Sequence, residues 1–292
     1  MKPLALSFCL LCSCVSVAEP APQSMGGPFP VAQAAQTHGP GPQSAATSTR
    51  PPRYVEPKPY NFDAHAGWQS MFDGETLAGW EGPMDFWHVE DGAIVATDSA
   101  GFRSLYLYWA GSDGGVLGDF EFKAEIKLEG EGANSGVQFR AHLLGKTEKE
   151  HSEWESFGYQ ADLDYANEQT GALIECCAGP RRGPAPRPFR ASAGMYIAAA
   201  SAPEIRPTLI GMIGEPAQLK ETINVGEWNQ LHIIARGHTL SYFLNGQLMS
   251  MVVDNDPLRY ISHGRLAIQL EGGGDRKVSY RNLWLKTYDK DN

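Results

Sequence analysis

The chain has 292 residues, of which 42% are hydrophobic, and its formal net charge at pH 7 is −10. All-β domains often reach about 200–250 residues as one unit, so the chain has ample material for a single large core. The negative charge argues against nucleic acid and against an acidic membrane surface as partners, because both would repel the protein.

The amino terminus carries a short apolar run, from Leu4 to Val17, which ends in small residues before Glu19. This pattern is typical of a signal peptide over residues 1–18, and the run is too short to span a bilayer as a permanent helix. We therefore expect an exported protein, periplasmic or extracellular. The alternative is a loose lipobox that ends at Cys14, in which case a lipid anchors the protein to a membrane.

Residues 19–60 are rich in Pro, Gly, Ala, Gln and Ser, with few apolar side chains to offset the entropy cost of ordering. We predict a flexible, disordered tether there, followed by one β-sandwich domain over residues 61–289.

Removal of the signal peptide leaves only Cys176 and Cys177, too few for a disulfide framework. Two buried thiols are the favoured state, because adjacent cysteines rarely form a bridge.

Several segments alternate apolar and polar residues with the period of two that half-buried strands show. The clearest is 120–129, whose apolar side is predicted to be buried and whose charged side is predicted to be fully solvated. Asp91-Gly92 and Asn245-Gly246 are dipeptides typical of tight turns. No segment after the signal peptide has a sustained helical period, which predicts an all-β, antiparallel jelly-roll sandwich. Further strands are expected over 231–236, 240–244, 247–253, 265–271 and 278–286.

Residues 178–222 fit this pattern poorly, and we predict a long loop there. The segment contains Pro, Gly and the arginines Arg181, Arg182, Arg187 and Arg190. Loops of this length are usually either functional or disordered, so a lid over a site and a mobile surface excursion both stay open.

Polar residues recur on one side of four predicted strands. Amides, a guanidinium and carboxylates that meet on one face are able to hydrogen-bond a sugar, so we predict a carbohydrate or glycoside ligand. The alternative is that these side chains simply face water. Strand by strand, the residues are Gln138, Arg140 and His142; Gln160 and Asp162; Glu175; and Gln269 and Glu271.

No metal or cofactor is predicted. After the signal peptide the sequence has no His-x-x-x-His pair and no Cys-x-x-Cys pair. It also lacks a Gly-x-Ser-x-Gly elbow, a phosphate-binding loop and a dinucleotide fingerprint. An oxygen-ligated Ca²⁺ stays open, although the sequence carries no signature for it.

Six sequence blocks carry a resemblance to a known family. They are Met71-Phe72-Asp73-Gly74-Glu75-Thr76-Leu77-Ala78-Gly79-Trp80, Asn134-Ser135-Gly136-Val137-Gln138-Phe139-Arg140, Gly158-Tyr159-Gln160-Ala161-Asp162, Gly226-Glu227-Trp228-Asn229, Leu244-Asn245-Gly246 and Tyr280-Arg281-Asn282-Leu283. With these blocks in this order, residues 67–286 resemble the 3-keto-disaccharide hydrolase domain family. The resemblance implies a concanavalin A-like jelly roll, secreted or periplasmic, that acts on 3-keto glycosides.

The chemistry implied by this resemblance needs a general base. A ketone at C3 makes the C2 proton acidic, so a base removes it while the aglycone leaves C1, and water then adds. By the matching motifs, Asp162 or Glu175 is the implied base, Arg140 the cationic stabiliser and Gln160 a sugar-binding amide. The other members of the predicted substrate-binding set are Gln138, His142, Gln269 and Glu271.

The leading expectation is therefore an exported hydrolase that cleaves 3-keto glycosides. The alternative is a non-catalytic carbohydrate-binding module, since jelly rolls often bind glycans and a fold does not fix a function. Glu271 favours the module, because relatives commonly carry His at that position. A tethered surface-structural protein is a third reading, supported only by the Pro-rich tether.

Overall fold

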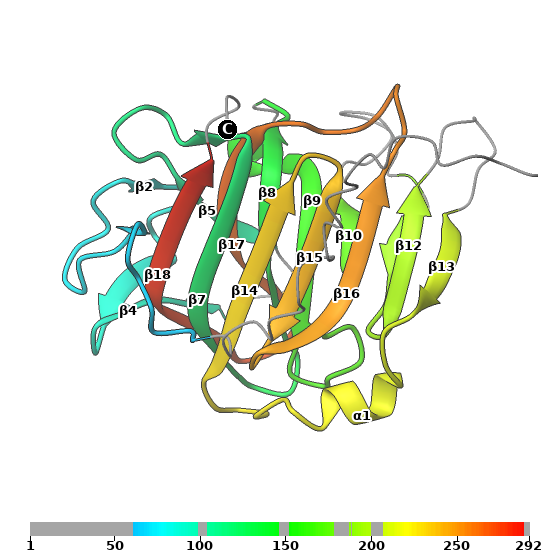
Figure 1. Ribbon diagram of the computed structural model, residues 1–292. Helices are drawn as coiled ribbons and strands as arrows, with labels where there is room; N and C mark the ends of the chain where they lie inside the picture. The colour runs from blue at the N-terminus through cyan, green and yellow to red at the C-terminus, as the bar shows by residue number, and fades with distance from the viewer. Residues whose placement is uncertain are drawn as a thin grey trace, which may run out of the picture. The chain divides into compact units, whose positions relative to one another are not determined.

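The computed structural model describes residues 61–98, 104–145, 152–177, 187, 189–199 and 207–288. The predicted signal peptide, over 1–18, and the predicted tether, over 19–60, lie outside these residues. No helix within the described ranges is long and apolar enough to cross a membrane. Nearly every regular element is a strand, and the strands form two layered sheets (Figure 1).

Ten strands form the first sheet: β1 (Gln69–Ser70), β3 (Trp87–Glu90), β4 (Ala93–Asp98), β7 (Asp119–Glu129), β12 (Met195–Ala199), β13 (Thr208–Met212), β14 (Asn229–Arg236), β15 (Thr239–Leu244), β16 (Gln247–Asp254) and β18 (Arg276–Tyr288). Their order is β13-β12-β16-β15-β14-β7-β18-β4-β3, and β1 pairs with β18. Within the described part of this sheet the pairs are antiparallel, apart from β12 with β16.

Eight strands form the second sheet: β2 (Trp80–Glu81), β5 (Leu105–Trp109), β6 (Val116–Leu117), β8 (Ala133–Leu143), β9 (Ser156–Asp164), β10 (Leu173–Cys176), β11 (Arg190–Ala191) and β17 (Gly264–Gly272). Their order is β11-β10-β9-β8-β17-β5-β2, with β6 paired to β17. A 3₁₀ turn, η1 (Ser152–Trp154), precedes β9, and the helix α1 (Pro216–Lys220) follows β13. Figure 1 shows this sheet behind the first.

Alternate residues of the two sheets point between the layers and form one hydrophobic core. On β7 the core residues include Phe122 and Ile126, as predicted for 120–129. The opposite side is not fully solvated, because Lys123 is buried there. Its Nζ donates hydrogen bonds to the backbone oxygens of Phe62, at 3.0 Å, and Ala64, at 3.2 Å. These bonds replace the water that a buried ammonium group would lose.

The all-β sandwich predicted from the sequence is confirmed, and so are its two tight turns. Asp91 and Gly92 connect β3 to β4 with φ angles of 49° and 70°. Asn245 and Gly246 connect β15 to β16 with φ angles of 49° and 77°. Positive φ at both central residues is the geometry that matches the twist of a hairpin.

The segment 178–222, predicted as one long loop, contains regular structure in its described parts. The strands β11, β12 and β13 and the helix α1 all lie within it. β11 extends the second sheet beside β10, and β12 extends the first sheet beside β16. The prediction was wrong because these strands are short, and pairing with an existing edge forms them where their own sequence does not.

Candidate functional site

Four strands of the second sheet present polar side chains on the face opposite the core. On β9, for example, Tyr159 and Ala161 are buried in the core, so Gln160 and Asp162 point to the other side. Cross-strand pairing places Gln138 of β8 opposite Gln160 of β9, and Gln269 of β17 opposite Tyr106 of β5. We call this set the polar face: Tyr106, Gln138, Gln160, Asp162, Gln269 and Glu271.

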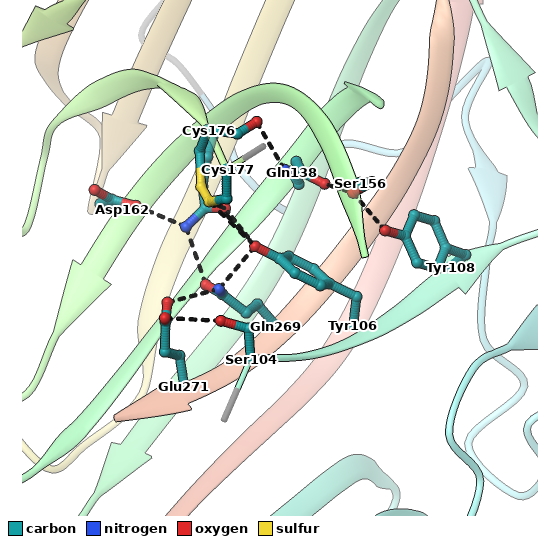
Figure 2. The surroundings of a disulfide bond; sticks show 11 residues. Ser104, Tyr106, Tyr108, Gln138, Ser156, Asp162, Cys176, Cys177, Gln269 and Glu271 are labelled. Atoms are coloured by element: carbon teal, nitrogen blue, oxygen red, sulfur yellow. Dashed lines mark hydrogen bonds between the residues drawn. A yellow bond between two sulfur atoms is a disulfide. The ribbon is translucent and has the colours of Figure 1, made fainter. Parts of the chain in front are cut away.

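Three of these side chains form a closed ring of hydrogen bonds (Figure 2). Gln160 Nε2 donates to Gln269 Oε1 at 3.0 Å, and Gln269 Nε2 donates to the Tyr106 hydroxyl at 2.9 Å. The Tyr106 hydroxyl donates in turn to Gln160 Oε1 at 3.2 Å. Because each amide both donates and accepts within the ring, the ring fixes the orientation of both amides.

Each amide of the ring also holds one carboxylate. Gln160 Nε2 donates to Asp162 Oδ1 at 2.9 Å, and Gln269 Nε2 donates to Glu271 Oε2 at 2.8 Å. Ser104 Oγ donates to the second oxygen of Glu271, Oε1, at 2.7 Å. The structure therefore brings together four of the residues predicted for the site, with a carboxylate at either end of the amide pair.

Asp162 has the properties of a group that exchanges a proton near neutral pH. Burial raises its pKa to about 7, and the charge of Glu271 acts in the same direction. The hydrogen bond from Gln160 and the charge of Arg190 oppose this rise. Across the described ranges, no group donates a hydrogen bond to the second carboxylate oxygen, Oδ2. This oxygen therefore keeps its capacity to accept a proton.

Gly136 makes space for the amide that orients Asp162. It lies opposite Asp162 in the β8–β9 pair. A Cβ atom at this position would lie 3.2 Å from Gln160 Nε2 and 2.7 Å from the backbone oxygen of Ala161. Only glycine therefore lets the Gln160 side chain lie across β8 toward Gln269.

Arg140 was predicted to lie on the polar face, and this prediction was wrong. The register of β8 shifts between Phe139 and His142, and Arg140 has a φ of +48°. Such a β-bulge adds one residue and inverts the alternation beyond it. The buried Arg140 guanidinium donates to the backbone oxygens of Gly237, at 2.9 Å, and Ile261, at 3.1 Å, and pairs with Asp119 at 3.0 Å. Arg140 therefore joins the two sheets and cannot reach Asp162.

The same bulge displaces His142 from the polar face. His142 pairs with Phe157, which belongs to the core side of β9. Its ring is exposed and meets the ring of His263 edge-on, with centroids 5.7 Å apart. Ala141 takes the place on the polar side, opposite Arg265 of β17.

Glu175 also lies on the wrong side of its strand. It is the cross-strand partner of Tyr159, so it points away from Gln160. Its buried carboxylate pairs with Arg187 at 2.5 Å and with Arg259 at 2.9 Å. Of the two bases considered from the sequence, only Asp162 lies on the polar face.

Arg187 balances the charge of two further carboxylates beside Glu175. It pairs with Asp254 at 2.6 Å and with Asp256 at 3.2 Å. These carboxylates surround a guanidinium, and no group of three His, Cys, Asp or Glu side chains within the described ranges is arranged to bind a metal ion. Arg187 thus fixes one point of the 178–222 segment against β10 and β16.

Gln138 lies on the polar face but outside the ring. Its Nε2 donates to the backbone oxygen of Cys176 at 3.2 Å, and its Oε1 accepts from Ser156 Oγ. Cys176 and Cys177 form a disulfide, where two thiols were predicted (Figure 2). The Tyr106 hydroxyl lies 3.5 Å from Cys177 Sγ, so the disulfide adjoins the ring.

Two residues on this side of the sheet were not predicted as site residues, Tyr106 and Arg190. Tyr106 belongs to β5, where leucines and tyrosines alternate. This period of two indicates a strand with tyrosines on one side. Both sides of the strand are apolar, however, so the pattern does not distinguish the tyrosine side from the core side. Arg190 lies opposite Ile174, which lies opposite Gln160, so it shares their side of the sheet. It is exposed, and no described side chain forms an ion pair with it. Its place in the 178–222 segment gave no signal for this position.

Solved structures of similar architecture include carbohydrate-active and carbohydrate-binding proteins. A proposed glycosyl hydrolase from Parabacteroides distasonis is 18% identical, with a TM-score of 0.45, and the match covers 77% of this chain and 95% of that one. A carbohydrate-binding module from Bacillus subtilis is 14% identical, with a TM-score of 0.44 over 72% and 96% of the two chains. A laminarinase catalytic domain from Thermotoga maritima is 11% identical, with a TM-score of 0.43 over 77% and 97%. No functional conclusion follows from similarities of this size.

None of the curated proteins compared with the chain matches it. A family match, in contrast, extends over residues 67–286, which include most of both sheets and the whole polar face. It agrees with the resemblance that the six sequence blocks carry. The chain therefore belongs to the 3-keto-alpha-glucoside-1,2-lyase-like domain family.

Proposed function

We propose that the protein cleaves 3-keto glycosides by removing the C2 proton with Asp162. Membership of the family supports a carbohydrate-related function. The observation that carries the finer proposal is the state of Asp162, a buried carboxyl with a pKa of about 7 and one oxygen that accepts no hydrogen bond from the described residues. A base with this pKa is charged in half of the molecules at neutral pH and still holds a proton well once it has taken it.

The proposed reaction has two stages. Asp162 Oδ2 takes the proton from C2, and the electron pair of the broken C–H bond forms an enolate with the C3 ketone. The enolate then expels the aglycone from C1, so that a C1–C2 double bond forms and the aglycone oxygen leaves with its electron pair and takes a proton from water. The hydroxide left from that water then adds at C1, and Asp162 returns its proton to C2, which completes the hydrolysis and restores the base.

The amide ring and Arg190 have separate parts in this proposal. Both N–H groups of Gln160 and of Gln269 are already donated within the described network, so these amides hold the carboxylates in place. Arg190 is an exposed cation on this side of the sheet, and its charge already acts on Asp162. We assign to it the stabilisation of the negative enolate, the part that the sequence had led us to give to Arg140.

The test is release of the aglycone from a 3-keto-α-glucoside by the purified protein. We expect turnover by the wild type and a loss of at least about a hundredfold in kcat for Asp162→Asn, within the range found when a general base is removed. Asp63→Asn, which changes an exposed carboxylate outside the site, is the matched control. Full activity of Asp162→Asn overturns the proposal.

A binding module remains the second candidate, and Glu271 favours it. This carboxylate is only partly buried and already oriented by Ser104 and Gln269, as in a site that recognises sugar hydroxyl groups. Sugar binding by calorimetry, with no turnover of any 3-keto glycoside by the wild type, would establish the module instead.

A further inference from the structure

A tryptophan borders the polar face at the end of β5. Trp154, the last residue of η1, packs over Tyr108 with the ring centroids 6.1 Å apart and the planes inclined by 27°. Tyr108 is fully buried, whereas Trp154 stays partly exposed. Together with Tyr106, Ala141 and Ala267 they form a small apolar cluster outside the main core. A flat, partly exposed aromatic ring therefore lies on the same side of the sheet as Asp162.

Tyr108 contacts this tryptophan through its hydroxyl as well as its ring. The Tyr108 hydroxyl lies 2.9 Å from the backbone oxygen of Trp154 and 2.5 Å from Ser156 Oγ. Ser156 Oγ donates to Gln138 Oε1, and so the polar face and the tryptophan share one network. An aromatic group that is already ordered loses little entropy when a ligand stacks on it.

The register of the sheet gives the distance between Tyr108, beneath Trp154, and Gln160, beside Asp162. Tyr108 pairs with Ala267, Ala267 with Gln138, and Gln138 with Gln160, so one row crosses four strands. Three strand spacings separate Tyr108 from Gln160, about 14 Å. A single sugar ring above Asp162 does not reach that far, whereas a second ring does.

We propose that Trp154 is the platform of a second subsite, which binds a ring in the aglycone of the substrate. The inference rests on the proposed function, and it adds the residue that contacts the aglycone, whether that aglycone is a second sugar or an aryl ring of similar length. The flat apolar side of a sugar or aryl ring stacks on Trp154, while the 3-keto sugar lies over Asp162. Ala267, between the two ends, has no side chain long enough to obstruct the ligand.

The experiment compares two substrates in three variants. One substrate is methyl 3-keto-α-glucoside, which has no ring in its aglycone, and the other is a 3-keto disaccharide. We expect Trp154→Ala to lower kcat/KM for the disaccharide about three- to tenfold, the range for one aromatic stacking contact, and to leave the methyl glycoside within about twofold. Trp154→Phe retains a ring and should lie between. The control, Trp228→Ala, removes a partly exposed tryptophan that directly precedes β14 of the first sheet.

Equal losses on both substrates, or none on either, overturn the subsite and leave the proposed function standing. Absence of turnover with both substrates in the wild type overturns the proposed function. In that case calorimetry measures the binding of the unoxidised disaccharide and of methyl α-glucoside, and the comparison decides whether Trp154 forms a second subsite. Weaker binding of the disaccharide alone by Trp154→Ala supports it, and equal binding by wild type and variant overturns it.

Discussion

Gln160 donates a hydrogen bond from Nε2 to Oδ1 of Asp162 at 2.9 Å. The same nitrogen donates to Gln269 at 3.0 Å, so the amide cannot rotate without breaking both bonds. One oxygen of the carboxylate is thus held, and the other is left for a ligand. The hydrogen bond favours the charged form of Asp162 while burial favours the neutral form, and the pKa of about 7 reflects both.

The first prediction concerns the pH dependence of the reaction. Only the ionised form of Asp162 accepts a proton, so kcat/KM should rise with pH and level off above a pKa of about 7. Gln160→Ala removes an interaction that lowers this pKa, and it should move the rise to higher pH. Rates of a 3-keto glycoside measured from pH 5 to pH 9 check both statements. A rise centred near 4, the ordinary range of a carboxyl group, would contradict the assignment.

The second prediction concerns stability. The pKa of Asp162 is raised in the folded protein from its ordinary value of 3.8 to about 7, so ionisation disfavours folding. Its contribution to stability is therefore present below about pH 4 and is lost as the pH rises to about 7. Asp162→Asn never ionises, so at pH 8 it should be more stable than the wild type by about 1–3 kcal/mol. Urea denaturation at pH 8 and pH 5 measures the difference, which should shrink at pH 5. An unchanged difference, or a less stable variant at pH 8, would contradict the raised pKa.

Much of the fold follows from local patterns in the sequence. The strand predicted over 120–129 is observed as Asp119–Glu129, and the one predicted over 265–271 as Gly264–Gly272. Alternation and turn dipeptides specify such strands without any knowledge of their neighbours. Lys123 shows the limit of this information, because residues some sixty positions earlier cover it.

The candidate site was predictable only where its strands are regular. On β9 and β17 the period of two continues without interruption, and Gln160, Asp162, Gln269 and Glu271 lie on one face as expected. On β8 it breaks at Arg140. A Cβ at Gly264, the first residue of β17, would lie 2.3 Å from the carbonyl carbon of Arg140. The bulge therefore packs against a strand that comes more than a hundred residues later in the sequence. No local pattern reports a contact of that kind.

The third prediction concerns Arg187. Its guanidinium pairs with Glu175 at 2.5 Å and with Asp254 at 2.6 Å, and both carboxylates are fully buried. Arg187→Ala leaves them without this partner, which should cost about 3–5 kcal/mol of stability. Arg236→Ala, which changes an arginine at the exposed end of β14, is the control and should cost far less. Chemical denaturation of the two variants makes the comparison, and equal stability would contradict the proposed role of Arg187.

The fourth prediction distinguishes a catalytic role of Arg190 from a structural role of Arg140. Arg190→Ala should lower kcat about tenfold or more, because it removes the cation assigned to the enolate, and should change stability by no more than about 0.5 kcal/mol. Arg140→Met should instead lower stability, since it removes the hydrogen bond to the carbonyl of Ile261 and the cation that pairs with Asp119. Single-turnover rates and denaturation curves of both variants supply the test. A kinetic defect in Arg140→Met at temperatures where it is folded, with none in Arg190→Ala, would reverse the assignment.

The fifth prediction concerns Gly136, the residue that gives Gln160 its space. Gly136→Ala introduces a Cβ that would lie 2.7 Å from the backbone oxygen of Ala161 and 3.2 Å from Gln160 Nε2. The strand must shift and the amide must leave its position, at a cost of about 1–3 kcal/mol. Because Asp162 then loses its orienting bond, kcat should fall together with stability. Gly211→Ala, where no atom lies within 4 Å of the added Cβ, is the matched control. If displacement of Gln160 causes the kinetic loss, Gly136→Ala should cost less activity in a Gln160→Ala background than in the wild type. An equal loss in both backgrounds would show that Gly136 does not act on the reaction through the Gln160 amide.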